Sequence, residues 1–423
     1  MKYSSKNNYS YVFYIIKLLY ITTACFLLIN ISGCALKTVT RTKPLDRSEA
    51  PPMMLIPPGQ YPVFTDDIHF DGLEQSIYKS ISYLKRVPPD RKFIFGKDTY
   101  NSTHMIKSLE FFSRFIQKKP SKSALKKFVE SKYLVYRSTG KDNNSQVLYT
   151  GYYEPFLKGS LYKSPLYKYP VYPIPEDRLT IDLSLFSDKF KGEKKIIGRY
   201  SGNKTIVPYY NRKEIESGNL LENSAKPIAW VKDRIDLFFL EIQGSGKIYL
   251  NNGKLINVHY HASNGHRYRA IGKLLLDEGK ILRSEMSMQR IKTYLKNHPD
   301  EVRRILNYNP SYIFFKLEED GPIGCLNVKL TPGRSVATDR RIFPAGALAF
   351  IETKKPIVDG DEKIHSWADF GRFVLNQDTG GAITGPGRAD IFWGNGEYAE
   401  IAAGYMQHTG RLYFLILKPD TKL

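Results

Sequence analysis

Short β-prone runs separated by turn residues fill much of the chain after about residue 145, and they restrict the fold more than any other feature. Three of these runs are QVLYTGYYEP, DLFFLEIQGSGKIYL and DFGRFVLNQD. They do not alternate with helices as parallel βαβ units do, so the pattern predicts a barrel or a sandwich. Helical periodicity interrupts the strands at Tyr268 to Asp277, at Met288 to Lys296 and after Pro299.

Before residue 145 the pattern is helical. Leu73, Ile77, Ile81 and Leu84 recur at the spacing of one helix face, a second stripe includes Phe112, and a shorter third helix is expected after Ser123. Such stripes predict packing against a core. With 42% hydrophobic and 25% charged residues over 423 positions, the chain is long enough for two or three domains.

The N-terminus has the features of an export signal. Lysines precede an uncharged run that ends at Gly33-Cys34, and small residues before a cysteine resemble the lipobox of bacterial lipoproteins. Cleavage there would remove residues 1–33 and leave Cys34 as the lipidated first residue. An uncleaved membrane anchor over residues 11–33 is the alternative, and either reading places the rest of the chain outside the cytoplasm.

Cysteine usage agrees with this placement. After loss of Cys25 with the signal and lipidation of Cys34, Cys325 has no partner, so no internal disulfide is expected. Residues 34–60 are polar and rich in proline, which predicts a tether.

The charge balance predicts an acidic partner. With 63 basic and 42 acidic residues the formal charge is +21, which suits nucleic acid, an anionic membrane surface or an acidic polymer. Export argues against nucleic acid.

The stretch DTGGAITGPGRADIFWG carries the main chemical candidates, Asp378 and Asp390. Asp378 opens a glycine-rich turn, where an aspartate often serves local hydrogen bonds. Asp390 is followed by Ile391, Phe392 and Trp393, so on a strand it would alternate with apolar neighbours, and burial would raise its pKa. A carboxylic acid that is still protonated near neutral pH can act as a general acid.

Three other features have both a functional and a structural interpretation. The Asp-Thr-Gly triplet at Asp378 also occurs in retroviral-type aspartic proteases, although one triplet would then require a dimer. His259, His261 and His266 lie close together in the sequence, and the first two would share a strand face as metal ligands do. No fourth ligand is evident, so surface or half-buried histidines are expected. Thr150, Tyr152 and Tyr153 suit sugar binding, and Gln243-Gly244-Ser245-Gly246 is either a plain turn or a close approach to a ligand.

Six motifs in consistent order resemble the membrane-bound lytic murein transglycosylase A family. They are GYYEP, EIQGSG, NGHRYRAIGKLLLDEG, MSMQRI, SVATDRRIFPAG and DTGGAITGPGRADIFWG, spread over roughly residues 145–418. The resemblance implies a mainly β fold with peripheral helices, in which a double-psi β-barrel carries a second, inserted β-rich domain. Under it, the barrel domain comprises residues 61–155 and 322–423, and the insert comprises residues 156–321.

The same resemblance implies a peptidoglycan lytic transglycosylase. Such an enzyme cleaves the β-1,4 bond between N-acetylmuramic acid and N-acetylglucosamine and forms a 1,6-anhydro product, without a metal or organic cofactor. The expected protein is a monomer, lipid-anchored at the periplasmic face of the outer membrane of a Gram-negative bacterium, and a non-catalytic wall-binding lipoprotein is the alternative. The implied site residues are Asp390 as the catalytic acid, Asp378 and Asp339 in support, and Thr150, Tyr152, Tyr153, Gln243, Ser245 and Trp393 at the glycan.

Overall fold

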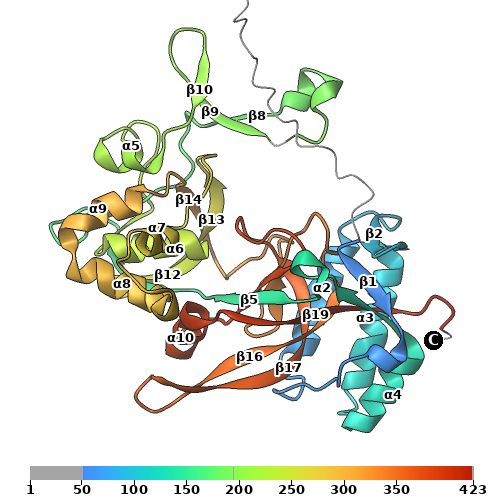
Figure 1. Cartoon of the computed structure of the whole chain (residues 1–423). Coiled ribbons are helices and arrows are strands. Elements are labelled where there is room, and N and C mark those ends of the chain that lie inside the picture. Colours follow the sequence, from blue (N-terminus) through green and yellow to red (C-terminus); the bar gives the residue numbers. More distant parts are fainter. Residues whose placement is uncertain (1–50, 194, 422–423) are drawn as a thin grey trace, which may run out of the picture. The chain divides into compact units, whose positions relative to one another are not determined.

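The largest sheet of the structure closes on itself (Figure 1). The computed structural model describes residues 51–193 and 195–421, and in this part of the chain six strands form a ring in the order β19-β16-β17-β15-β18-β5. The ring closes because β5 pairs with both β18 and β19, which leaves these strands without a free edge. Its members are β5 (Val147–Tyr152), β15 (Ser335–Ala337), β16 (Leu348–Val358), β17 (Ile364–Asp378), β18 (Arg388–Phe392) and β19 (His408–Leu417).

Two more strands extend this sheet beyond the ring. β4 (Tyr133–Ser138) pairs with β19, and β1 (Met53–Ile56) pairs with β4. Met53 and Ile56 are buried in the main core. The prediction that residues 34–60 form only a tether is therefore wrong for β1, because its apolar side chains find their partners only through pairing with a strand some 80 residues later.

Three helices cover parts of this sheet. α2 contacts β17, α3 contacts β19, and α4 contacts β4. The stripe predicted from Leu73, Ile77, Ile81 and Leu84 is buried, as expected for the core face of an amphipathic helix. The elements here are α2 (Leu73–Lys85), α3 (Ser102–Ile116), α4 (Lys122–Lys132) and the hairpin of β2 (Lys92–Phe95) and β3 (Asp98–Asn101).

A second, open sheet has the order β14-β13-β12-β6-β11-β7. The chain passes from the ring to this sheet between Tyr152 and Phe156, and it returns between Glu318 and Ser335. Positions 155/156 and 321/322 lie within these two connections, and the division of the chain into domains at these positions stays a prediction. The strands are β6 (Phe156–Ser160), β7 (Tyr169–Val171), β11 (Ala229–Val231), β12 (Ser245–Leu250), β13 (Leu255–Ser263) and β14 (Ile313–Glu318).

The prediction of a strand for the start of DLFFLEIQGSGKIYL is wrong, because α6 (Arg234–Gln243) is a helix. The Asp233 side chain caps its N-terminus, and Gly244, at φ +82°, ends it in the left-handed region. Phe238 faces a core shared with neighbouring helices, whereas Leu240 faces the core of the second sheet. Burial on two sides explains the continuous apolar run, which periodicity alone does not assign to helix or strand.

The predicted helical interruptions are present, although the first begins at Ile271 instead of Tyr268. Pro299 occupies the first turn of its helix, as expected for a residue without an amide hydrogen. The remaining helices are α5 (Arg212–Ser217), α7 (Ile271–Asp277), α8 (Met288–Asn297), α9 (Pro299–Asn307) and α10 (Glu397–Tyr405). A small sheet contains β8 (Leu179–Ile181), β9 (Ile196–Tyr200) and β10 (Ile206–Pro208) (Figure 1).

Among the described residues, none of the helices has both the length and the apolar character needed to span a membrane. The predicted signal segment, residues 1–33, and the predicted lipidation site, Cys34, lie outside the described residues. Cys325 is a free cysteine.

Candidate active site

Four neighbouring strands of the ring bring the predicted site residues into one row. Asp378 at the end of β17 pairs with Ala337 of β15, which in turn pairs with Asp390 of β18. On its other side Asp390 pairs with Thr150 of β5. Adjacent strands lie about 4.8 Å apart, so the backbones of the two aspartates are separated by roughly 10 Å.

Asp390 combines a half-buried position with one free carboxyl oxygen. Its neighbours Ala389 and Ile391 point into the core, whereas the Asp390 side chain, on the opposite face of β18, is 20% exposed. The Thr150 hydroxyl donates a hydrogen bond to Oδ1, and Arg388 Nη2 lies 3.6 Å from the same oxygen. Within the described part of the chain, no hydrogen bond reaches Oδ2.

The surroundings of Asp390 favour its protonated form. Burial raises the pKa of this carboxyl above its ordinary value, against the opposing effects of the Thr150 hydrogen bond and the Arg388 charge. This confirms the expectation of an aspartate whose pKa is raised by its place on a buried strand. Such a group can donate a proton from Oδ2 while Oδ1 is held in place.

Asp378 differs from Asp390 because both of its oxygens are occupied. The Tyr152 hydroxyl donates to Oδ2 at 2.8 Å, and the backbone N–H of Cys325 donates to Oδ1 at 3.0 Å. Burial raises the pKa of Asp378 to about 6, and the nearby charge of Asp390 acts in the same direction. With its oxygens engaged, Asp378 is suited to orient the loop and Tyr152.

Replacing Asp378 by asparagine should stabilise the folded protein at pH 7.5. A carboxyl whose pKa is raised by folding contributes stability at low pH that is lost as pH rises from its unfolded value near 4 through about 6. The neutral amide avoids that loss, and it can keep both contacts if its oxygen accepts from the Cys325 N–H and its NH2 group donates to the Tyr152 oxygen. We therefore expect a gain of about 1–3 kcal/mol in the free energy of unfolding. Urea unfolding of both proteins at pH 7.5 and at pH 4 measures it.

The pH 4 measurement is the internal control, because most Asp378 side chains are then protonated in the folded protein and the two proteins should differ little. A variant that is no more stable than the parent at pH 7.5 would contradict the raised pKa.

Asp339 fixes the loop between β17 and β18. Arg341 donates to both carboxyl oxygens, at 2.9 and 2.6 Å, and the N–H of Gly385 donates to Oδ2 at 2.8 Å. Burial acts to raise the pKa of Asp339, but these hydrogen bonds and the Arg341 charge lower it below its ordinary value. Asp339 is thus an ionised structural carboxylate that ties the glycine-rich loop to the end of β15.

Comparison with known proteins places the chain in a family. Family models match at residues 148–316, described as the MltA specific insert domain, and at residues 334–416, described as a 3D domain. Membrane-bound lytic murein transglycosylase A of Escherichia coli K12 is 33% identical over 287 residues, which cover 67% of this chain and 69% of that protein. The chain belongs to the membrane-bound lytic murein transglycosylase A family.

Solved structures agree with this assignment. A membrane-bound lytic murein transglycosylase from Agrobacterium tumefaciens is 30% identical and has a TM-score of 0.69, with 86% of this chain and 97% of that one covered. Escherichia coli MltA with bound chitohexaose is 26% identical and has a TM-score of 0.65, with 88% and 96% covered. The sheet-dominated fold with a closed six-stranded ring is therefore that of the transglycosylase A family.

Two residues expected at the glycan are packed in the core of this family member. Tyr153 is 2% exposed and Trp393 is 8% exposed. The Trp393 ring lies against Gly151, where an added Cβ would be only 2.7 Å from its Cδ1 and Nε1 atoms. Both rings therefore contribute to packing in the described protein, and their direct contact with a glycan remains a prediction. Thr150 and Tyr152, by contrast, contact the two aspartates.

The Gln-Gly-Ser-Gly motif connects the second sheet to the ring. Gln243 Oε1 accepts a hydrogen bond from the N–H of Tyr153 at 3.0 Å, just beyond the end of β5. Ser245 is buried at the start of β12. A Cβ on Gly246 would lie 2.4 Å from Leu240, so close packing within the protein requires this glycine. Contact of Gln243 and Ser245 with a glycan remains a prediction.

Arg388 is a candidate that sequence reasoning missed. Its Nη2 donates to the Thr150 hydroxyl oxygen at 3.0 Å, which leaves the hydroxyl hydrogen to point at Asp390. Residues two apart on a strand share a face. The sequence could therefore have indicated that Arg388, two positions before Asp390 on the same strand, lies beside the proposed acid.

Glu154 is a second residue that sequence reasoning missed. It is 1% exposed, and its Oε2 lies 3.5 Å from Lys247 Nζ and 3.3 Å from Asn395 Nδ2. These partners come from the second sheet and from the segment after β18. Glu154 thus holds the connection between the two sheets beside the candidate site.

The histidines of β13 are half-buried or exposed, as expected. An irregularity in the pairing with β14 between Tyr260 and Ala262 interrupts strict alternation, so His259 is half-buried and His261 is exposed. Burial and the Lys316 charge lower the pKa of His259 to about 4. No group of three or more potential metal ligands occurs in the searched, described residues.

Proposed function

We propose that this protein is a peptidoglycan lytic transglycosylase in which Asp390 is the only proton-transferring residue. The family assignment supports the activity, since its relatives are named lytic murein transglycosylases. The observation that carries the role of Asp390 is its geometry. One carboxyl oxygen is held by Thr150, the other is free of hydrogen bonds in the described chain, and burial raises the pKa.

In the proposed reaction Asp390 first donates its proton to the glycosidic oxygen between N-acetylmuramic acid and N-acetylglucosamine. The C1–O bond breaks, the N-acetylglucosamine side leaves as an alcohol, and Asp390 becomes a carboxylate. That carboxylate then removes the proton from the C6 hydroxyl of the muramic acid, while the C6 oxygen forms a bond to C1. The product is a 1,6-anhydro sugar, and Asp390 regains the proton with which it started.

One carboxyl group is sufficient because the nucleophile is already part of the substrate. Hydrolytic glycosidases need a second carboxylate to activate water or to attack C1. Here the C6 hydroxyl reacts intramolecularly, which gives a high effective concentration. Asp378 supports this reading, since Tyr152 and the Cys325 amide occupy the oxygens that a second base would need.

The Arg388–Thr150 pair has a defined place in this cycle. It binds the ionised form of Asp390 more strongly than the protonated form, because a carboxylate is the better acceptor for the Thr150 hydroxyl. The pair therefore offsets part of the cost of the buried charge after the first proton transfer.

The finer features of the family resemblance also belong to the proposal. The ring mixes parallel pairs, β15–β17 and β18–β5, with antiparallel ones, which is compatible with a double-psi barrel. We infer a monomer held at the outer membrane through lipidated Cys34, facing the periplasm. The charge of +21 suits the anionic cell wall.

Mass spectrometry of the products released from purified sacculi tests the function. We expect soluble fragments that end in 1,6-anhydro-N-acetylmuramic acid, which are one water lighter than the hydrolysis products. Fragments with reducing ends would instead indicate a hydrolase with Asp378 as the second carboxylate. Binding to sacculi without any release would indicate a non-catalytic wall-binding lipoprotein.

The aspartic protease alternative lacks support. That chemistry needs two carboxyls close enough to share a proton, whereas Asp378 and Asp390 are two strands apart and have separate hydrogen-bond partners.

A further inference from the structure

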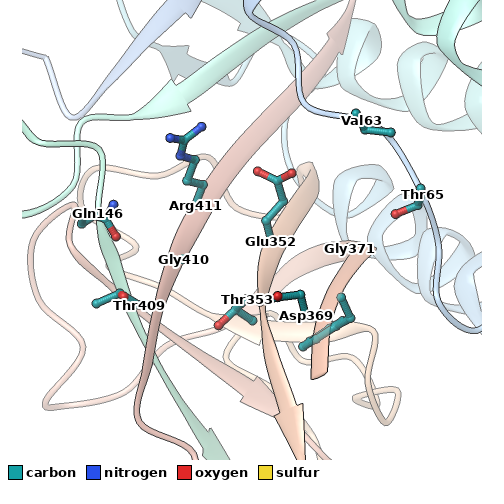
Figure 2. Close-up of a pocket in the computed structure, with 11 residues that line it drawn as sticks. Val63, Thr65, Gln146, Glu352, Thr353, Asp369, Gly371, Thr409, Gly410 and Arg411 are labelled. Atoms are coloured by element: carbon teal, nitrogen blue, oxygen red, sulfur yellow. The ribbon is translucent and has the colours of Figure 1, made fainter. Parts of the chain in front are cut away.

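A cavity lies on the ring, and neither Asp378 nor Asp390 is part of its lining. Figure 2 shows it with the side chains that line it. Its volume is about 530 Å³, within the range of small-molecule sites. It opens where β19 stops pairing with β16 and begins to pair with β5. Its lining combines charges, hydroxyls and glycines, among them Glu352, Arg411, Asp369, Thr353 and Gly410.

The cavity contains a carboxylate and a guanidinium that do not pair with each other. Glu352 and Arg411 are directly opposite on β16 and β19, so their side chains share one face. Figure 2 shows both charged ends pointing to the same side. Within the described part of the chain, neither residue has an oppositely charged partner within 4 Å. Asp369, the third charged residue of the lining, is instead paired with Lys354 at 3.3 Å.

A buried phenol holds these two charges in place. The Tyr413 hydroxyl donates to Glu352 Oε2 at 3.1 Å, and it also interacts with Arg411. Burial raises the pKa of Tyr413 to about 12, so the phenol is neutral and adds no charge beside Glu352, which forms no ion pair within 4 Å among the described residues. Two opposite charges on one wall, separated by a neutral spacer, are complementary to a ligand that carries both charges itself.

The remaining lining suits a compact polar ligand. Among the described residues, the hydroxyl of Thr353 is buried without a hydrogen-bond partner, and the hydroxyls of Thr65 and Thr409 also belong to the lining. An added Cβ on Gly410 would lie 2.0 Å from the carbonyl oxygen of Glu352, so the wall at this point has no room for a side chain. The cavity thus offers charge at one end and hydroxyls along its sides.

We propose that this cavity binds a zwitterionic amino-acid group, with the ligand carboxylate on Arg411 and the ligand ammonium on Glu352. The site goes beyond the proposed lytic activity and does not involve Asp390. Two sources share this chemistry, namely free amino acids or short peptides, and wall stems in which one residue keeps both a free amino group and a free carboxyl group. The first amino group of a stem does not qualify, because it is bound in an amide to muramic acid.

Isothermal titration of the full-length, detergent-solubilised protein with the dipeptide alanyl-alanine tests the proposal. Two blocked forms, one amidated at the C-terminus and one acetylated at the N-terminus, each remove one charge from the probe. We expect the parent to bind the free dipeptide and to bind each blocked form about ten-fold or more weakly. Arg411→Gln and Glu352→Gln should each bind the free dipeptide more weakly than the parent does, by the same factor as the blocked forms.

The pairing of variant and probe excludes a merely structural effect. Amidation of the dipeptide should not weaken its binding to Arg411→Gln any further, but it should still weaken binding to Glu352→Gln. Acetylation of the dipeptide should still weaken binding to Arg411→Gln, but it should have no further effect on binding to Glu352→Gln. Arg267→Gln, an exposed arginine outside the cavity, is the matched control and should bind as the parent does. Equal binding by parent and Arg411→Gln, or no binding by the parent at millimolar dipeptide, would overturn the proposal.

A final pair of measurements distinguishes the two possible origins of the ligand and separates this proposal from the enzymatic one. Tighter binding of a disaccharide-peptide than of the dipeptide would assign the site to wall stems, and equal binding would assign it to free amino acids. Digestion of peptide-free glycan strands should be unchanged in Arg411→Gln. A protein that binds dipeptide but releases no anhydro-sugar would refute the enzymatic proposal alone.

Discussion

Asp390→Asn should reduce digestion of purified sacculi by about 10³-fold or more. A single general acid or base contributes roughly 10²–10⁴ in rate, and here one carboxyl performs both proton transfers. The asparagine amide cannot transfer a proton to the glycosidic oxygen, and it is too weak a base to remove the proton from the C6 hydroxyl. The release of soluble, anhydro-ended fragments over time measures the effect.

The fold should survive this change. Asparagine keeps an oxygen that accepts the Thr150 hydrogen bond, and it removes a carboxyl whose charge the buried site disfavours. The variant should therefore unfold at the same temperature as the parent or slightly above it. Asp361→Asn, in the exposed turn between β16 and β17, is the control and should leave digestion unchanged. Full activity of Asp390→Asn in a folded protein would refute the assignment.

Of the variants described here, Asp66→Ala should lose the most stability. Arg334 and Asp66 form a buried ion pair, with side chains 0% and 1% exposed and two hydrogen bonds of 2.6 and 2.8 Å. Asp66 also accepts from the N–H groups of Phe70 and Phe373. Removing one partner leaves a buried, uncompensated charge, which costs about 3–5 kcal/mol. Urea unfolding at neutral pH measures the loss.

Two further variants make this test specific. Asp71→Ala lies in the same loop, but its side chain is exposed, so we expect a change within about 0.5 kcal/mol. Asp66→Leu combined with Arg334→Met replaces both charges by apolar groups, and it should recover much of the stability lost in Asp66→Ala. A loss below about 1 kcal/mol in Asp66→Ala would show that solvent reaches Arg334 more readily than the structure indicates.

Local patterns predicted the elements whose side chains repeat regularly. The helix face at Leu73, Ile77, Ile81 and Leu84 could be predicted because its periodicity was clear. The strands near the C-terminus could be predicted because β-prone runs alternate with turn residues, although β17 and β19 are buried over continuous stretches. Prediction failed for α6, where burial on two sides removes the periodicity. Prediction also failed for β1, because a strand of 4 residues is too short to show a periodicity.

The candidate site divides in the same way. Asp390 could be selected from its own segment, since apolar neighbours on a strand predict burial and a raised pKa. Sequence could not distinguish Tyr152 from Tyr153, which are adjacent and chemically identical. One reaches Asp378 and the other is packed in the core, because successive residues of a strand face opposite sides.

The sequence by itself determined which side chains can carry charge, hydrogen bonds and apolar surface, and through family motifs it determined the class of chemistry. Only the tertiary structure decided which of these groups meet. Thr150 reaches Asp390 across 240 residues of chain, and Arg334 reaches Asp66 across 268. Such contacts depend on strand register and ring closure, which arise from the packing of the whole core. The pKa of a carboxyl depends on those contacts, so the proposed catalytic state of Asp390 is a property of the folded protein.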